Sequence, residues 1–217
     1  MKMDGGRMLV FAREPSPGRV KTRLIPALGA EGAASLYQRL LEKTLAVASG
    51  LENVATELWY TCEREEPARC RELAQNHGAS LHRQQGEDLG ERMFNALAAD
   101  PSSSHRPSVL IGSDCPAYSR TYLYRAFDVL KEKDAVLGPA VDGGYVLIGV
   151  QLAHRHLFDH VPWGSGDVLA QTRRRLDDLQ WNWAELDPLR DVDRPGDLAH
   201  FPGLMVDGEF APEGIES

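Results

Sequence analysis

The sequence predicts an α/β fold of three layers, in which helices cover both faces of a mainly parallel, mixed β-sheet. Short apolar segments of strand length alternate along the chain with longer segments whose apolar residues recur every three or four positions. This alternation is typical of parallel sheets that lie between two layers of helices. The length of 217 residues suits one domain. We therefore predict a single domain over residues 1–217, in which residues 202–217, rich in Gly, Pro and acidic side chains, form a loosely held tail.

Seven segments have the length and composition of β-strands. The first, residues 8–12, is an apolar run that ends in a turn-rich segment, and the fourth, residues 108–112, has the composition of a fully buried strand. The fifth and sixth are separated by an Asp-Gly-Gly turn at residues 142–144. The predicted strands are residues 8–12, 57–62, 80–83, 108–112, 135–137, 145–150 and 181–186.

Five longer segments and one short one have the pattern of helices. In the first, the apolar residues between Ala33 and Ala48 share one face at three- and four-residue spacing. The third begins at Asp88, a capping residue followed three positions later by Glu91, and the last opens with Pro195 in its first turn. The predicted helices are residues 33–48, 66–76, 88–100, 123–130 and 167–179, with the short one starting at residue 195.

Composition and charge argue against several classes of function. Hydrophobic residues make up 42% of the chain and charged residues 26%, and the formal net charge is −8. Such an acidic chain lacks the basic face that general binding to nucleic acid or to an anionic membrane requires, and we expect no membrane span. The three cysteines form no paired motif, which favours a reducing compartment, so we expect a cytoplasmic protein. No pattern specifies an oligomeric state.

A basic loop directly after the first strand is the strongest candidate for phosphate binding. Its four cations are Arg13, Arg19, Lys21 and Arg23. Two prolines and Gly18 keep the loop non-helical, and backbone amides around Gly18 can bind anions together with the side chains. The alternative interpretation is a solvated basic loop. The position after the first strand favours phosphate, because ligands of such sheets bind beyond the carboxyl ends of the strands.

Asp114 is the strongest candidate for a metal ligand. It follows the most hydrophobic strand, between Gly112 and the strand-ending Pro116. A carboxylate beside bound phosphates suits Mg²⁺ or Mn²⁺, because hard cations take oxygen ligands and share them with phosphate. The sequence therefore predicts that Asp114 binds metal and acts in catalysis. The alternative is that Asp114 caps the following helix, but Ser119 is better placed for that role.

The Asp-Gly-Gly-Tyr turn after the fifth strand is a second candidate site. We predict Asp142 as a second metal ligand or as a catalytic group that binds an acceptor hydroxyl. Gly143, Gly144 and Tyr145 are predicted to line the acceptor pocket, because the double glycine opens room beside the sheet. Asp-Gly is also a strong hairpin signal, so a purely structural turn is the alternative.

Two further acidic segments permit both a functional and a structural interpretation. Asp88 and Gly90 lie at a predicted helix start, where the helix amino terminus can receive a phosphate or a nucleotide ribose. Helix capping explains Asp88 equally well. Near the end of the chain, Asp191, Asp193 and Asp197 form an acidic cluster, and we interpret Asp193 as the cap of the final short helix.

Together these motifs resemble the DUF2064 family, also called the rSAM/selenodomain-associated transferase 1 family. The resemblance rests on residues 11–24, 86–93, 112–116, 138–149 and, more weakly, 191–198. The chain is similar to nucleotide-diphospho-sugar transferases of the GT-A fold, and more distantly to phospholactate guanylyltransferase and molybdenum cofactor nucleotidyltransferases. The resemblance implies a Rossmann-like domain with a nucleotide cleft. It also implies that Arg13, Lys21 and Arg23 hold phosphates and that Asp114 lies where related enzymes bind metal.

We therefore expect a transferase that uses a nucleotide or nucleotide-sugar, with Mg²⁺ or Mn²⁺ as cofactor. The leading hypothesis is glycosyl transfer from a nucleoside-diphosphate sugar. Asp114, with Asp142, would hold the metal, while Arg13, Lys21 and Arg23 stabilise charge on the leaving group. One alternative is nucleotidyl transfer from a nucleoside triphosphate with release of pyrophosphate. Another is a catalytically silent nucleotide-binding partner of a different enzyme.

Overall fold

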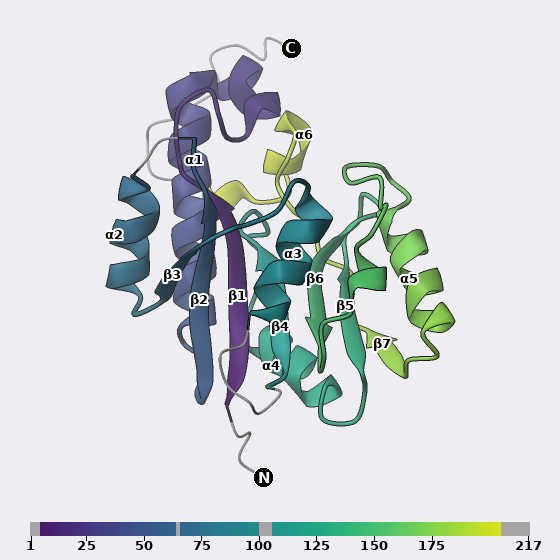
Figure 1. Ribbon diagram of the computed structural model, residues 1–217. Helices are drawn as coiled ribbons and strands as arrows, with labels where there is room; N and C mark the ends of the chain where they lie inside the picture. The colour runs from purple at the N-terminus through teal and green to yellow at the C-terminus, as the bar shows by residue number, and fades with distance from the viewer. Residues whose placement is uncertain (1–4, 64–65, 100–105, 205–217) are drawn as a thin grey trace.

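Seven strands form one β-sheet within residues 5–63, 66–99 and 106–204, which the computed structural model describes. They are β1 (Gly6–Arg13), β2 (Val54–Thr61), β3 (Ser80–Arg83), β4 (Ser108–Gly112), β5 (Ala135–Pro139), β6 (Tyr145–Val150) and β7 (Trp183–Glu185). The strand order is β3-β2-β1-β4-β6-β5-β7 (Figure 1). Strand β6 is antiparallel to both of its neighbours, and the other adjacent pairs are parallel.

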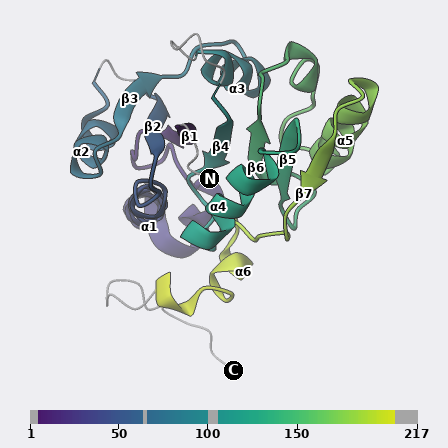
Figure 2. The ribbon, with the colours of Figure 1, turned by 90° about the horizontal axis from the view of Figure 1, so that it is seen from below.

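Helices cover both faces of this sheet. The α-helices are α1 (Ile25–Ala48), α2 (Ala68–Asn76), α3 (Leu89–Ala98), α4 (Arg120–Val129), α5 (Val168–Asp178) and α6 (Pro195–Leu198). Short 3₁₀ helices are η1 (Thr22–Leu24), η2 (Arg155–Leu157) and η3 (Pro202–Leu204). Helices α1, α2 and α4 lie on one face, and α3 and α5 on the other (Figure 2). The predicted three-layer α/β fold with a mainly parallel, mixed sheet is confirmed.

Two hydrophobic clusters, one on each face of the sheet, form the core. Alternate residues of β1 point to opposite faces, so Met8 and Val10 join the cluster under α1, α2 and α4, whereas Leu9 and Phe11 join the cluster under α3 and α5. Met8, Leu9 and Val10 are fully buried. A strand buried on both faces reads as a continuous apolar run, which is why the sequence predicted it clearly.

Each predicted strand and helix overlaps an observed one, and the differences lie at the ends. Helix α1 begins at Ile25, earlier than the apolar stripe indicated, and is interrupted at Gly29, whose φ of 69° is non-helical. Ser119 caps α4 as expected, since its side chain accepts a hydrogen bond from the Tyr122 amide at 3.1 Å. Of the predicted tail, residues 205–217 lie outside the described residues.

The sheet brings loops that are distant in sequence to one edge. Strands β1, β2, β3 and β4 are mutually parallel, so their carboxyl ends lie together. Phe11 of β1 is level with Gly112 of β4, and Arg13 is level with Thr61 of β2. The basic loop after β1 therefore meets the Asp114 loop after β4. None of the helices in the described ranges has an apolar stretch of membrane-spanning length.

Candidate functional site

Two cavities meet at the carboxyl edge of the sheet. We call the cavity of about 500 Å³ the cationic chamber, because Arg13, Arg19, Lys21, Arg23 and Arg92 line it. We call its neighbour, of about 660 Å³, the acidic chamber. Its carboxylates are Asp114, Asp142, Asp191, Asp193 and Asp197, accompanied by Arg23, Arg190 and Arg194. Both chambers are lined by Phe11, Arg23, Leu89, Gly112, Asp114 and Asp193. Asp114 thus lies at the junction.

The loop that carries the cations is anchored at its start by Glu14. This carboxylate is 8% exposed and accepts hydrogen bonds from the backbone amides of Arg69 (2.8 Å) and Cys70 (3.0 Å), at the start of α2. A carboxylate satisfies the otherwise unpaired amides of a helix amino terminus. The chain then turns at Gly18, whose φ of 76° favours glycine. Glu14 had no recognisable signal in the sequence, because its partners lie on a distant helix.

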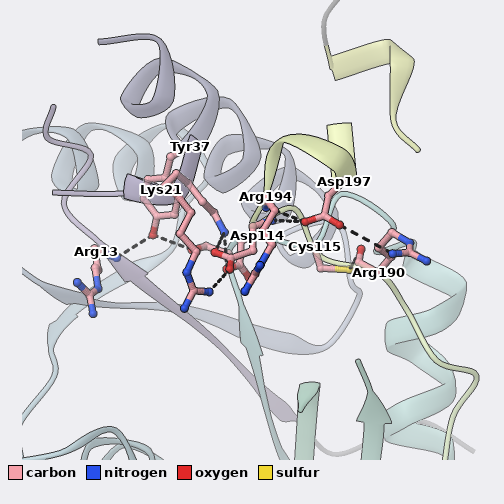
Figure 3. A network of polar contacts seen from close by, with 11 residues as sticks. Arg13, Lys21, Tyr37, Asp114, Cys115, Arg190, Arg194 and Asp197 are labelled. Atoms are coloured by element: carbon pink, nitrogen blue, oxygen red, sulfur yellow. Dashed lines mark hydrogen bonds and ion pairs between the residues drawn. The ribbon is translucent and has the colours of Figure 1, made fainter. Parts of the chain in front are cut away.

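Tyr37 of α1 connects the basic loop to the Asp114 loop (Figure 3). Its hydroxyl oxygen accepts a hydrogen bond from the Arg13 amide at 2.8 Å and lies 2.8 Å from Ser113 Oγ. Burial raises the pKa of Tyr37 well above its ordinary value, so the phenol stays protonated and can donate to Ser113. The sequence identified Tyr37 only as a residue of the apolar face of α1.

Two cations of the loop, Lys21 and Arg23, are paired with aspartates of the junction. Lys21 Nζ lies 2.9 Å from Asp114 Oδ2 and 3.8 Å from Asp193 Oδ1. Arg23 pairs with Asp193, and its side chain is mainly exposed. The predicted phosphate-binding residues Lys21 and Arg23 and the predicted metal ligand Asp114 therefore lie in one cluster.

Asp191 belongs to this cluster, although we had not proposed it as a site residue. Its neighbours tie it to the Asp114 loop: the Val192 amide donates to the Asp114 backbone oxygen at 3.0 Å, and Cys115 Sγ donates to the Arg190 oxygen at 3.4 Å. Burial, together with the charges of Asp114 and Asp142, raises the pKa of Asp191 to about 6. Burial also raises the pKa of the Cys115 thiol to about 12, so this thiol stays protonated.

The interpretation of Asp193 as a helix cap is wrong. The N-cap residue of α6 is Arg194, and Pro195 occupies the first turn as expected. The backbone amides of Asp193 and Arg194 donate instead to Asp197 Oδ2, at 3.0 and 2.7 Å. Asp197 satisfies these amides from within the helix, so the Asp193 carboxylate is available to Lys21 and Arg23.

The turn between β5 and β6 borders the acidic chamber. Asp142, Gly144 and Tyr145 line this chamber. Asp142 Oδ1 also accepts a hydrogen bond from the Gly144 amide at 3.0 Å, so the turn has a structural role besides its place at the cavity. Gly143 has a φ of 93° and faces the backbone of Gly166 rather than the cavity. Burial raises the pKa of Tyr145 above its ordinary value.

Comparison with known proteins gives the family of this chain. Residues 44–165 match the sequence model of DUF2064, described as uncharacterised protein conserved in bacteria. The chain belongs to the DUF2064 family. It is also 31% identical to a proposed nucleotide-diphospho-sugar transferase from Desulfovibrio desulfuricans G20 over 88% of this chain and 84% of that one, with a TM-score of 0.80. Comparison with curated protein sequences found no match.

More distant structures share the fold of this DUF2064 protein. A cytidylyltransferase from Leptospira borgpetersenii is 18% identical over 88% of this chain and 78% of that one, with a TM-score of 0.54. A 4-diphosphocytidyl-2C-methyl-D-erythritol synthase from Anaerococcus prevotii is 10% identical over 94% of this chain and 97% of that one, with a TM-score of 0.61. At these identities the similarity concerns the fold alone.

Four of the predicted site residues of the DUF2064 protein lie outside both chambers. They are Gly18, Asp88, Gly90 and Gly143. Asp88 caps α3 by accepting from the Glu91 amide at 2.8 Å. Gly90 was predicted to receive a phosphate or ribose, but it faces the protein instead, since an added Cβ would lie 2.5 Å from the Phe158 oxygen and 2.7 Å from Trp163 Nε1.

Two carboxylates of the DUF2064 site have the donor chemistry that a divalent metal would require. Asp114 and Asp142 both line the acidic chamber, and their charges contribute to the raised pKa of Asp191. Within the described ranges no group of three or more His, Cys, Asp or Glu side chains is arranged to hold a metal. Mg²⁺ is commonly bound by one or two carboxylates together with substrate phosphates and water, and that arrangement needs no such group.

Replacing Asp191 by Asn in the DUF2064 protein is expected to stabilise the fold at pH 8 but hardly at pH 4. The pKa of Asp191 is raised from 3.8 to about 6, so stability falls as pH rises through this window and the loss is complete above it. Discounted for solvent screening, the expected gain at pH 8 is about 1 kcal/mol, or about 2–4 °C in Tm. Thermal unfolding of the variant and of the unsubstituted protein at both pH values measures this gain. Equal Tm values for the two proteins at pH 8 would contradict the prediction.

Proposed function

We propose that this chain is a transferase that acts on a nucleotide-activated substrate, and that it transfers a glycosyl group from a nucleoside-diphosphate sugar. The observation that carries the proposal is the junction of two chambers at Asp114, one lined by cations and the other by carboxylates. A donor nucleotide in the cationic chamber would place its phosphates beside Asp114, and an acceptor in the acidic chamber would approach from the other side.

The cationic chamber suits the phosphates of the donor. Arg13, Lys21 and Arg23 line it together with Arg92. Guanidinium groups bind phosphate oxygens through two parallel hydrogen bonds, and an ammonium adds a compact charge. Leaving-group charge that develops during transfer would be stabilised by these groups, because they are positioned before the reaction begins.

The far end of the cationic chamber suits the base. Gln84, just after β3, donates from Nε2 to the backbone oxygens of Ala12 (3.2 Å) and Trp59 (2.9 Å). Backbone oxygens only accept, so the amide nitrogen must face them and Gln84 Oε1 is left to accept from a ligand N–H. From β4 to β3 the chamber crosses three strand spacings, about 14 Å in all. This length accommodates a nucleotide with phosphates at Asp114 and its base at Gln84.

The acidic chamber suits an acceptor with a hydroxyl group. Asp142 and Asp191 line it and can accept a hydrogen bond from such a hydroxyl. Tyr145 and Trp163, whose rings meet edge to face at 6.4 Å between centroids, form an apolar wall. Asp114, with Asp142, would hold Mg²⁺ or Mn²⁺, which when bound would neutralise charge on the diphosphate. The similarity to the proposed nucleotide-diphospho-sugar transferase from D. desulfuricans supports a nucleoside-diphosphate sugar as the donor.

Nucleotidyl transfer is the second candidate, and the number of cations favours it. Five basic side chains line the cationic chamber. A diphosphate does not require so many, whereas a triphosphate whose pyrophosphate leaves would use more of them. In that reaction the acidic chamber would hold a phosphate or hydroxyl acceptor that attacks the nucleotide.

Product analysis distinguishes the two reactions. The purified full chain is incubated with Mn²⁺, a panel of nucleoside triphosphates or nucleoside-diphosphate sugars, and a panel of hydroxyl-bearing and phosphate-bearing acceptors. The release of pyrophosphate and of nucleoside diphosphate is measured. Glycosyl transfer or donor hydrolysis releases nucleoside diphosphate from a sugar nucleotide. Pyrophosphate release alone would reject glycosyl transfer in favour of nucleotidyl transfer. Thermal stabilisation by a nucleotide without either product would support a silent binding partner, and the absence of any stabilisation would reject nucleotide use.

A further inference from the structure

The ammonium of Lys21 occupies a position between two carboxylates at the junction of the chambers. Lys21 Nζ lies 2.9 Å from Asp114 Oδ2 and 3.8 Å from Asp193 Oδ1. Figure 3 shows the side chain directed from the basic loop toward Asp114. The Lys21 side chain is only 5% exposed. A buried ammonium requires anionic groups to offset its lost hydration, so Asp114 and Asp193 form a cation site that Lys21 occupies.

The backbone holds Lys21 in this place against its local preference. Lys21 has φ 45° and ψ 43°, the left-handed region that residues other than glycine seldom adopt. Such a conformation persists only where the surroundings enforce it. The Lys21 backbone oxygen accepts from the Leu24 amide at 2.8 Å, and the preceding Val20 is buried against Ala34 and Tyr37. The ammonium is therefore a built-in part of the junction.

We propose that Lys21 is an internal counter-ion that competes with a divalent metal for Asp114. Asp114 is the carboxylate through which a metal would be held, and an ammonium and a metal ion cannot share it closely because their charges repel. Where the proposed function holds, nucleotide phosphates draw the ammonium away and leave Asp114 to the metal. Metal and nucleotide then strengthen each other's binding by the same factor, as linkage requires.

Binding of Mn²⁺ to the full chain without nucleotide tests the competition. Lys21→Met keeps the length of the side chain and removes the charge, so Mn²⁺ affinity is expected to rise at least about tenfold in titrations followed by electron paramagnetic resonance. Lys21→Gln, with a polar end group, is expected to give the same direction if the Met variant folds poorly. Lys131→Met is the matched control, because Lys131 also pairs with an aspartate, Asp128 at 2.5 Å, but lines neither chamber. Its Mn²⁺ affinity should stay within about twofold of the unsubstituted protein.

Adding Asp114→Asn to the Lys21→Met variant should abolish the gain in Mn²⁺ affinity. The proposal is overturned if both Lys21 variants bind Mn²⁺ no more tightly than the unsubstituted protein, or if the gain survives without the Asp114 carboxylate. No nucleotide is used, so a positive Mn²⁺ result beside a negative transfer assay would reject the proposed function while supporting the role of Lys21.

Discussion

Replacing Asp114 by Asn is expected to reduce transfer by about 10² to 10³-fold, the range found when one preorganised charge-stabilising group is removed from an active site. Asp114 lies at the junction of the two chambers, 2.9 Å from Lys21. The change removes the charge but keeps the shape of the side chain, which is 37% exposed. Lys21 keeps Asp193 as an anionic neighbour at 3.8 Å, so the fold should persist. Two measurements check this prediction: the initial rate of transfer, and the affinity for nucleotide with and without Mn²⁺. Both the rate and the metal-dependent part of the nucleotide affinity should fall.

Asp187→Asn is the matched control for this measurement. Asp187 makes an ion pair with Arg125 at 3.0 Å, and its side chain is 80% exposed. Asp187 lines neither chamber. The same chemical change at this position should leave transfer and Mn²⁺ dependence unaltered. If Asp114→Asn behaved like Asp187→Asn, the assignment of the junction as the reaction centre would be wrong.

Replacing Gly143 by Ala is expected to destabilise the protein by about 3 kcal/mol, because two separate costs combine. Gly143 has a φ of 93°, which strains any residue with a side chain, and an added Cβ would overlap the backbone oxygen of Gly166. Backbone atoms cannot move aside cheaply, and the Gly143 oxygen also accepts from the Leu169 amide at 3.0 Å, in the first turn of α5. In a chain of this length the expected fall in Tm is about 6–12 °C.

Gly196→Ala makes the same substitution at a position beside the site where it should be harmless. A Cβ at Gly196 meets no atom within 4 Å, and Gly196 lies in α6, where Ala is the better helix former. Its Tm should be unchanged or slightly higher. Thermal unfolding gives the Tm of both variants. Equal shifts in Tm for Gly143→Ala and Gly196→Ala would contradict the prediction. Because Gly143 directly follows Asp142, the Gly143→Ala variant should also displace Asp142 and lose transfer activity accordingly.

The basic loop and Asp114 are the parts of the candidate site that local sequence patterns could predict. Both could be predicted because each directly follows an apolar strand, and the carboxyl ends of parallel strands meet at one edge. Asp191 and Asp193 were missed as site residues, since nothing in their own segment distinguishes a helix cap from a group that faces a cleft. The role of Asp193 depends on Lys21 and Arg23, and the state of Asp191 depends on the charges of Asp114 and Asp142, all of which lie far away in sequence.

By itself, the sequence determined the order of strands and helices, the faces they bury and the position of the cations and of Asp114 after their strands. Hydrophobic periodicity encodes these features, because burial acts on each segment according to its own pattern. Only the tertiary structure decided the pairing of groups. Lys21 meets Asp114 across 93 positions of chain, and Arg23 meets Asp193 across 170. Likewise Gly143 makes room for Gly166 rather than for a ligand. The packing of separate loops determines these partners, and no local sequence pattern encodes that packing.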